Sequence, residues 1–238
     1  MFLNEINSHN LSKIRHQKSL ILGGSKGLGC SISGCLPNSK SLSRSSSVES
    51  VDLSQPASIA LVEKHLLSFG PDLVFYVAGG GVYGEYFSKP MHSHRWTFEV
   101  NFFRPTQIAD LLKKSGFKGK FIYIGSAIAE RSESLKCISY SYSKKLAVKT
   151  LLSLSEEDLK VRVFSPPYMD TDLLPKNSWP RLESPQLVLN TQVVAAELLK
   201  WLAEDSSKDF KTLSEDFDPR HFDWIQRFKY TLPIDKNF

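Results

Sequence analysis

The sequence lacks the features that mark several large classes of protein. Its 3 cysteines are without the paired spacing of a zinc site or a disulfide framework, which favours a reducing compartment. No apolar run approaches the ~18 residues that span a bilayer, and the stretch 1–18 is too polar for a signal peptide. Lys and Arg are scattered rather than gathered into a stripe, which disfavours nucleic acid as a partner. These absences predict a cytoplasmic protein with no membrane contact.

The chain does carry enough apolar sequence for one core. Hydrophobic residues make up 41% of 238 residues, and single α/β units often run to about 250 residues. We therefore expect one domain over 1–238, with an N-terminal arm at 1–17 and a divergent aromatic tail at 214–238. Aromatic side chains at the tail's spacing favour packing, near a substrate mouth or a second subunit, over a membrane-surface helix. The formal charge of +5 favours an anionic small molecule as ligand.

Short apolar runs alternate with helical periodicity, a pattern typical of an α/β fold with a parallel sheet. Strands are expected at 18–22, 40–44, 72–78, 121–124, 161–164 and, at the edge, 210–213. Helices are expected at 28–36, 54–68, 92–113, 140–151 and 186–203. The stretch from Arg44 to Val51 is shorter than the ~10–12 residues that a parallel crossover needs. We therefore expect the usual helix between the second and third strands to be missing, and the third strand, at 51–53, to be rudimentary or absent.

A glycine-rich turn directly follows the first predicted strand and opens a helix. It reads Gly23-Gly24-Ser25-Lys26-Gly27-Leu28-Gly29. Glycines permit a tight turn and let the backbone approach a pyrophosphate, whose charge then lies at the positive N-terminus of the helix. The flanking strand and helix favour a dinucleotide-binding loop over a flexible linker. A second cluster, Gly79 to Gly81, ends a buried strand and suits a backbone that lies against a ligand.

The next predicted strand ends at Arg44. In dinucleotide folds this strand end faces the adenosine ribose, where an acidic side chain binds a 2′-hydroxyl and an arginine pairs with a 2′-phosphate. No Asp or Glu lies between Gly23 and Arg44, and Lys26 adds a second cation in the loop. The sequence favours NADP(H) over NAD(H) on these grounds. A solvated serine-rich turn at 43–47 is the alternative explanation of Arg44.

Tyr140 and Lys144 lie four residues apart in a predicted helix. That spacing places two side chains on one face, with about 6 Å between their Cβ atoms, so the ammonium can favour the phenolate. The same spacing arises by chance in many helices, where it means only an aromatic residue beside a charge. The glycine-rich turn and Ser126, at the end of an apolar run upstream, are what give this pair its weight.

Together these residues resemble the short-chain dehydrogenase/reductase family from about Lys18 to Thr171. The family's glycine loop corresponds to 22–29, and its Asn-Asn-Ala-Gly segment corresponds to 76–79. Its four catalytic residues also have counterparts in this sequence. The resemblance implies a Rossmann-type, doubly wound and mostly parallel sheet with helices on both faces. The catalytic residues that it implies are Asn101, Ser126, Tyr140 and Lys144. The cofactor-binding residues that it implies are Gly23, Ser25, Lys26, Gly27, Leu28, Gly29, Arg44, Asp52, Leu53, Ala78, Gly79, Tyr140, Lys144, Pro166 and Thr171.

The resemblance implies hydride transfer between a nicotinamide and a small carbonyl or alcohol substrate, without a metal. Tyr140 would be the acid/base, Ser126 would bind the reacting oxygen, and Asn101 would hold its helix open to a water that relays protons to Lys144. A polar residue in a packed helix is more often satisfied locally, which is the ordinary explanation of Asn101. Three proline residues at 175, 180 and 185 predict a loop-rich lid over the substrate.

The accessory motifs depart from the family pattern. Leu22 stands in place of a threonine, Tyr76 and Val77 in place of paired asparagines, and Pro167 in place of a glycine. These departures, with the divergent tail, leave a second hypothesis open: a non-catalytic dinucleotide-binding sensor or regulatory protein on the same fold. A homodimer is the expected assembly.

Overall fold

A six-stranded parallel sheet forms the centre of the protein. The computed structural model describes residues 8–45, 50–127, 129, 137–155, 159–204 and 208–213. Within them the sheet has the order β2-β1-β3-β4-β5-β6, and every pair of neighbours is parallel. The strands are β1 (Ser19–Leu22), β2 (Ser39–Leu42), β3 (Leu73–Tyr76), β4 (Lys120–Ile124), β5 (Lys160–Ser165) and β6 (Phe210–Thr212). The predicted edge strand near Phe210 is therefore confirmed.

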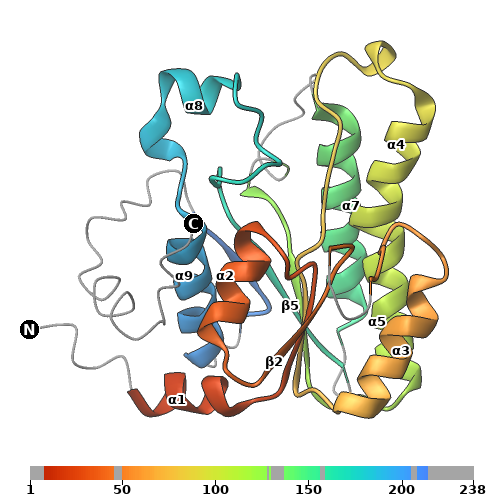
Figure 1. Ribbon diagram of the computed structural model, residues 1–238, viewed down its shortest axis with the longest axis vertical. Coiled ribbons are helices and arrows are strands. Elements are labelled where there is room, and N and C mark those ends of the chain that lie inside the picture. The colour runs from red at the N-terminus through yellow and green to blue at the C-terminus, as the bar shows by residue number, and fades with distance from the viewer. Residues whose placement is uncertain are drawn as a thin grey trace, which may run out of the picture.

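Helices cover both faces of the sheet, as predicted for a doubly wound fold (Figure 1). One face carries α1 (Ser8–His16), α2 (Gly27–Cys35) and α9 (Thr191–Ala203). The other carries α3 (Ser58–Phe69), α4 (Met91–Phe98), α5 (Arg104–Lys114) and α7 (Ile138–Ser153). Strand β1 shows why the core has two halves: Leu20 and Leu22 join the apolar cluster on one face, and Ile21 joins the cluster on the other.

The connection from β2 to β3 contains the shortened segment. Ser43 and Ser50 pair as an isolated parallel bridge, and the described residues after Ser50 form no strand before α3. Within the described residues the predicted third strand is thus reduced to one bridge, and α3 crosses to β3. The helix begins at Ser58 rather than at 54, because the Asp52 carboxylate accepts the Ser54 amide at 2.9 Å and holds a turn there.

Two further helices differ from their predicted bounds. The stretch expected as one helix over 92–113 is interrupted by a π-helical turn, η2 (Glu99–Phe103), between α4 and α5. Helix α9 starts at Thr191 instead of 186, because the Asn190 side chain caps it by accepting the Gln192 amide at 2.8 Å. The short helices are η1 (Tyr86–Ser88), α8 (Trp179–Glu183) and η4 (Pro185–Leu187).

The N-terminal arm is partly described, as helix α1, and the aromatic tail at 214–238 lies outside the described residues. Among the described helices, none combines the length and the hydropathy required to cross a bilayer.

Candidate active site

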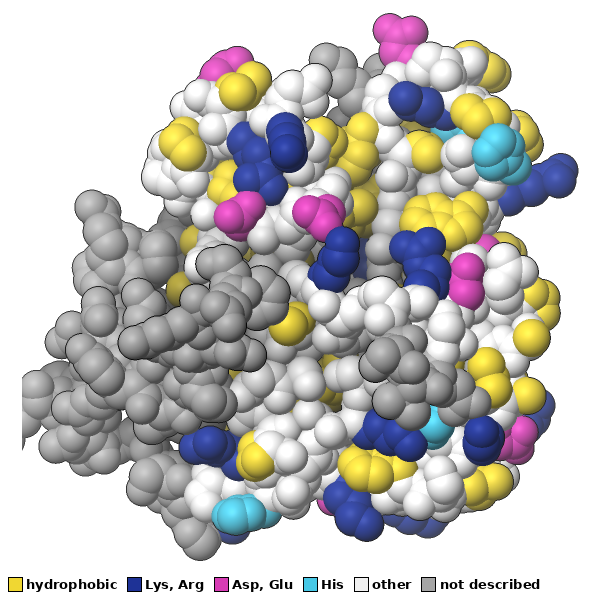
Figure 2. All heavy atoms as spheres, viewed as in Figure 1, with side chains coloured by type: hydrophobic (Ala, Val, Ile, Leu, Met, Phe, Trp, Pro, Cys, Tyr) yellow, Lys and Arg dark blue, Asp and Glu magenta, His cyan; other side chains and the backbone are white. Residues whose placement is uncertain are grey.

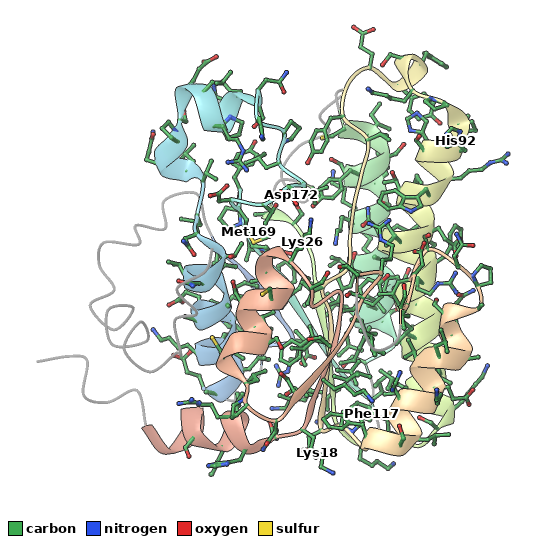
Figure 3. All side chains as sticks on the ribbon, in the orientation of Figure 1. Lys18, Lys26, His92, Phe117, Met169 and Asp172 are labelled. Carbon is green, nitrogen blue, oxygen red and sulfur yellow. The ribbon has the colours of Figure 1, made fainter. Side chains whose placement is uncertain are left out.

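The carboxyl ends of β1 to β4 open into one cleft of about 880 Å³, the position at which parallel sheets bind ligands. Figure 3 shows Lys26, Met169 and Asp172 together at this end, with Lys18 and Phe117 at the opposite end. The predicted residues on the wall of the cleft are Gly23, Ser25, Lys26, Gly27, Leu28, Arg44, Asp52, Leu53, Ala78, Gly79, Tyr140, Lys144 and Thr171. The remaining predicted residues, Gly29, Asn101, Ser126 and Pro166, are not part of that wall.

The glycine-rich turn draws three backbone segments together. Gly23 has φ of +99°, and a Cβ atom there would lie 2.5 Å from the Ala78 amide nitrogen. Gly27 has φ of +53°, and its Cβ would lie 3.1 Å from Cγ2 of Thr171. A side chain on Gly29 would collide with the carbonyl oxygen of Gly23. Because side chains are excluded, the turn forms a cradle of backbone amides at the N-terminus of α2, which suits a pyrophosphate.

Asn101 is fully buried in the π-helical turn η2, where it organises the inner end of the cleft. Its Nδ2 donates to the Gly80 carbonyl at 2.7 Å and to Ser143 Oγ at 3.0 Å, and its Oδ1 accepts the Gly80 amide at 3.1 Å. A Cβ atom on Gly79 would lie 3.3 Å from both Asn101 Oδ1 and Lys144 Nζ. Asn101 is therefore satisfied locally, and those local contacts fix the glycine strand end beside Lys144.

Two buried tyrosines explain why the π-helical turn is stable. A π turn frees backbone carbonyls from the ordinary helical pattern, and buried carbonyls need partners. The Tyr76 hydroxyl donates to the Val100 carbonyl at 2.6 Å, and the Tyr123 hydroxyl donates to the Asn101 carbonyl at 2.8 Å. The two tyrosines face each other in the β3/β4 register, with ring centroids 6.0 Å apart. The Asn101 carbonyl therefore already has a donor within the protein.

Tyr123→Phe tests this support directly. The variant keeps the ring but leaves the buried Asn101 carbonyl without its donor, so we expect the free energy of unfolding to fall by about 1–3 kcal/mol. Chemical denaturation measures this loss. Tyr142→Phe is the matched control, because Tyr142 is 46% exposed and should change stability by less than about 0.5 kcal/mol. Equal stability of the two variants would refute the supporting role of the Tyr123 hydroxyl.

Helix α7 places Tyr140 and Lys144 on one face, as their spacing predicted. Burial raises the pKa of Tyr140, a hydrogen bond with the Ser126 side chain lowers it, and Cys137 raises it again. Lys144 is 4% exposed, and burial lowers its pKa to about 7. Its Nζ donates to the Ile124 carbonyl at 2.7 Å and lies 4.7 Å from the centroid of the Tyr123 ring. The structure therefore brings Ser126, Tyr140 and Lys144 together with Asn101 behind them.

The other end of the cleft is lined by Ser43, Arg44 and Ser45 and by the turn at 51–54. The Asp52 carboxylate accepts both the amide and the hydroxyl of Ser54, at 2.9 and 2.8 Å. The Leu53 carbonyl accepts Nε of Arg104 at 2.9 Å. Arg104 is 1% exposed and also pairs with Glu99 at 2.5 Å, so it ties this turn to η2. Nothing in its sequence context distinguishes Arg104 from a solvated helical arginine, and sequence reasoning missed it.

The segment after β5 closes the cleft from the side of α2. Arg181, on α8, pairs with Asp170 at 2.7 Å and donates to the carbonyls of Thr171 and Leu174 at 3.0 and 3.2 Å. Lys26 forms an exposed ion pair with Asp172 at 3.5 Å. The predicted lid therefore contains a short helix as well as loops, and Arg181 fixes the stretch that carries Thr171. Arg181 is a second residue that the sequence did not point to.

The fold is shared with solved structures. No protein-family model matches the sequence, and no curated protein matches it either. The structure of BdcA in complex with NADPH superposes with a TM-score of 0.73 at 21% identity, over 85% of this chain and 95% of that one. A short-chain type dehydrogenase/reductase from Mycobacterium marinum gives a TM-score of 0.72 at 17% identity, over 86% and 98%. A short chain dehydrogenase from Burkholderia cenocepacia J2315 in complex with NADP gives 0.72 at 17%, over 87% and 99%. The chain thus has the fold of the short-chain dehydrogenases/reductases.

Proposed function

We propose that this protein is an NADP(H)-dependent oxidoreductase of the short-chain dehydrogenase/reductase family, acting on a carbonyl or alcohol substrate. The observation that carries the proposal is that Tyr140 and Lys144 line a glycine-rich cleft, with Ser126 hydrogen-bonded to Tyr140 behind its wall. The NADPH bound to BdcA and the NADP bound to the Burkholderia cenocepacia dehydrogenase support the choice of cofactor.

The residues present fit a dinucleotide. The side-chain-free turn at Gly23, Gly27 and Gly29 would take the pyrophosphate, with Thr171 on its far side. The turn at Asp52 and Leu53 would hold the adenine, and Arg44 would pair with a 2′-phosphate. Ala78 and Gly79 would lie under the nicotinamide half, beside Lys144. We assign Pro166 a supporting role, because its carbonyl accepts the Ala127 amide at 2.9 Å behind the wall.

The chain's own groups supply the proton chemistry. When bound, NADPH supplies the hydride that reduces the carbonyl carbon and is left as NADP⁺. Tyr140 donates its phenolic proton to the carbonyl oxygen, because burial keeps the phenol protonated at neutral pH. Ser126 donates a hydrogen bond to the same oxygen and stabilises the charge that develops there. Lys144 stabilises the phenolate that remains and holds the nicotinamide ribose, and Asn101 keeps the strand end in place.

Thermal unfolding with each cofactor tests the first step of the proposal. NADPH should raise the melting temperature more than NADH at equal concentration, since only NADPH carries a 2′-phosphate for Arg44 to bind. A larger shift with NADH would overturn the cofactor assignment. Oxidation of NADPH against a panel of carbonyl compounds then separates the oxidoreductase from the non-catalytic sensor, which would bind NADPH without consuming it.

Arg44→Gln provides a sharper version of the same test. Loss of a charge-assisted contact with the 2′-phosphate should raise the Kd for NADPH by about 10–100-fold and leave the Kd for NADH nearly unchanged. Lys40→Gln removes a cation from β2 away from the cleft wall and is the matched control. An equal loss of affinity for both cofactors in Arg44→Gln would show that Arg44 does not read the 2′-phosphate. The homodimer and the cytoplasmic location remain predictions.

A further inference from the structure

An aromatic side chain lies directly against Tyr140 on the substrate side. The chain leaves the glycine cluster so close to the tyrosine that a Cβ atom on Gly81 would lie 2.8 Å from Tyr140 Cβ. Two residues further on, the Tyr83 ring is within 28° of parallel to the Tyr140 ring, with centroids 6.4 Å apart. Burial raises the pKa of Tyr83, and the neighbouring groups of Tyr140, Cys137 and Tyr168 raise it further, so this surface stays uncharged.

The lid extends the same surface. Tyr168 lies close enough to Tyr83 to influence its titration, and the Tyr168 ring meets Trp179 of α8 edge-on at 6.4 Å. Trp179 is 50% exposed, so part of its ring is open to a ligand. Figure 2 shows hydrophobic side chains deep in the hollow between the lobe that carries α8 and the lobe that carries the start of α4. Two ring pairs, Tyr83–Tyr140 and Tyr168–Trp179, therefore supply aromatic surface beside the proton donor and on the lid.

Three charged groups of the lid, Asp170, Asp172 and Arg181, take part in ion pairs. Asp170 binds Arg181 at 2.7 Å, and Asp172 binds Lys26 at 3.5 Å. Arg181 also satisfies two backbone carbonyls of the lid, at 3.0 and 3.2 Å. A charged substrate would have to break these contacts to be held there, whereas a neutral one would not.

We propose that the substrate is an uncharged aromatic carbonyl compound, or the corresponding aryl alcohol, whose ring packs between Tyr83 and the Tyr168–Trp179 pair while its oxygen reaches Tyr140. This inference rests on the proposed function. In the reductive direction an aryl ketone gains a hydride from NADPH at carbon and the Tyr140 proton at oxygen. The products are the secondary aryl alcohol and NADP⁺. Each ring contact is worth about 0.5–1.5 kcal/mol beyond its area, or about 2–13-fold in affinity.

The test compares two ketones with the same carbon skeleton, acetophenone and cyclohexyl methyl ketone. Wild-type kcat/KM should be at least about 10-fold higher for acetophenone. Tyr83→Leu and Trp179→Leu should each remove much of that preference through KM, and Tyr83→Phe should retain it. Phe210→Leu is the control, because Phe210 is an exposed aromatic residue on the edge strand β6. Thermal unfolding confirms that each variant is folded.

A binding measurement keeps the inference separate from the proposed function. Calorimetry of acetophenone and cyclohexyl methyl ketone with the enzyme and NADP⁺, which has no hydride to give to a ketone, reports the aryl preference without turnover. A preference for the aryl compounds that falls in Tyr83→Leu supports the aromatic site. Equal or stronger binding of the cyclohexyl compounds overturns it, even if carbonyls are reduced. If the enzyme reduces no carbonyl compound, the proposed function is wrong. The calorimetry still shows in that case whether the site prefers aromatic rings.

Discussion

Replacing Tyr140 with phenylalanine should lower kcat for carbonyl reduction by about 10²–10⁴-fold, the range that a positioned general acid contributes. The change removes one hydroxyl, and the ring keeps its packing against Gly81 and Tyr83. What is lost is the proton that the carbonyl oxygen must receive, together with the hydrogen bond to Ser126. Steady-state NADPH oxidation measures the loss.

Cofactor binding is the internal control for this variant. The glycine turn, Arg44 and the Asp52 turn do not depend on the phenol, so the Kd for NADPH should stay within about 2-fold of wild type. Tyr142→Phe removes a hydroxyl from the same helix on an exposed side and should leave kcat unchanged. Undiminished turnover in Tyr140→Phe would exclude Tyr140 as the acid.

Replacing Lys144 with methionine should lower activity and raise stability together. Loss of the ammonium beside Tyr140 should cost about 10²–10³-fold in kcat. The buried lysine is itself costly to the fold, because burial lowers its pKa from 10.5 to about 7. That shift corresponds to a penalty on the order of a few kcal/mol. Methionine has similar volume and no charge, although it leaves the Ile124 carbonyl without its donor. We expect a net gain of about 1–3 kcal/mol at pH 7.

The stability difference between wild type and Lys144→Met should depend on pH. Between pH 7 and pH 10.5 the unfolded lysine holds a proton that the folded one has released. Stability rises with pH wherever the unfolded state binds more protons, so wild type should gain stability across this window while Lys144→Met should gain less. The advantage of the variant is therefore largest at or below pH 7 and shrinks as the pH rises toward 10.5. Chemical denaturation from pH 6.5 to 9.5 measures it, and a variant that is less stable than wild type at pH 7 would contradict it.

Most of the fold follows from patterns that short segments carry by themselves. Helices cover both faces of a parallel strand, so its residues form a continuous apolar run. The runs at 73–76 and before Ser126 therefore predict parallel strands. The short crossover after Arg44 could be identified by counting residues. The π-helical turn at Asn101 could not be predicted, because it depends on Tyr76 and Tyr123 from two other strands.

Some residues of the candidate site could likewise be found in the sequence, and others could not. The glycine-rich turn at Gly23 and the four-residue spacing of Tyr140 and Lys144 could be found in the sequence itself, and Ser126 could be found through the family resemblance. Arg104 donates to the Leu53 carbonyl, 51 residues earlier in the sequence, and Arg181 donates to the Thr171 carbonyl, 10 residues earlier. No local sequence pattern predicts either contact. Tyr83 shows the same limit, since its importance comes from lying against Tyr140 across a turn.

The transfer of deuterium from labelled NADPH follows the proposed hydride step itself. The enzyme would be incubated with carbonyl compounds and NADPH that carries deuterium at the transferable position of the nicotinamide. We expect an alcohol with deuterium at the carbinol carbon, formed by wild type and about 10²–10⁴-fold more slowly by Tyr140→Phe. Binding of NADPH by wild type with no labelled alcohol from any carbonyl would contradict this expectation and would favour the non-catalytic sensor.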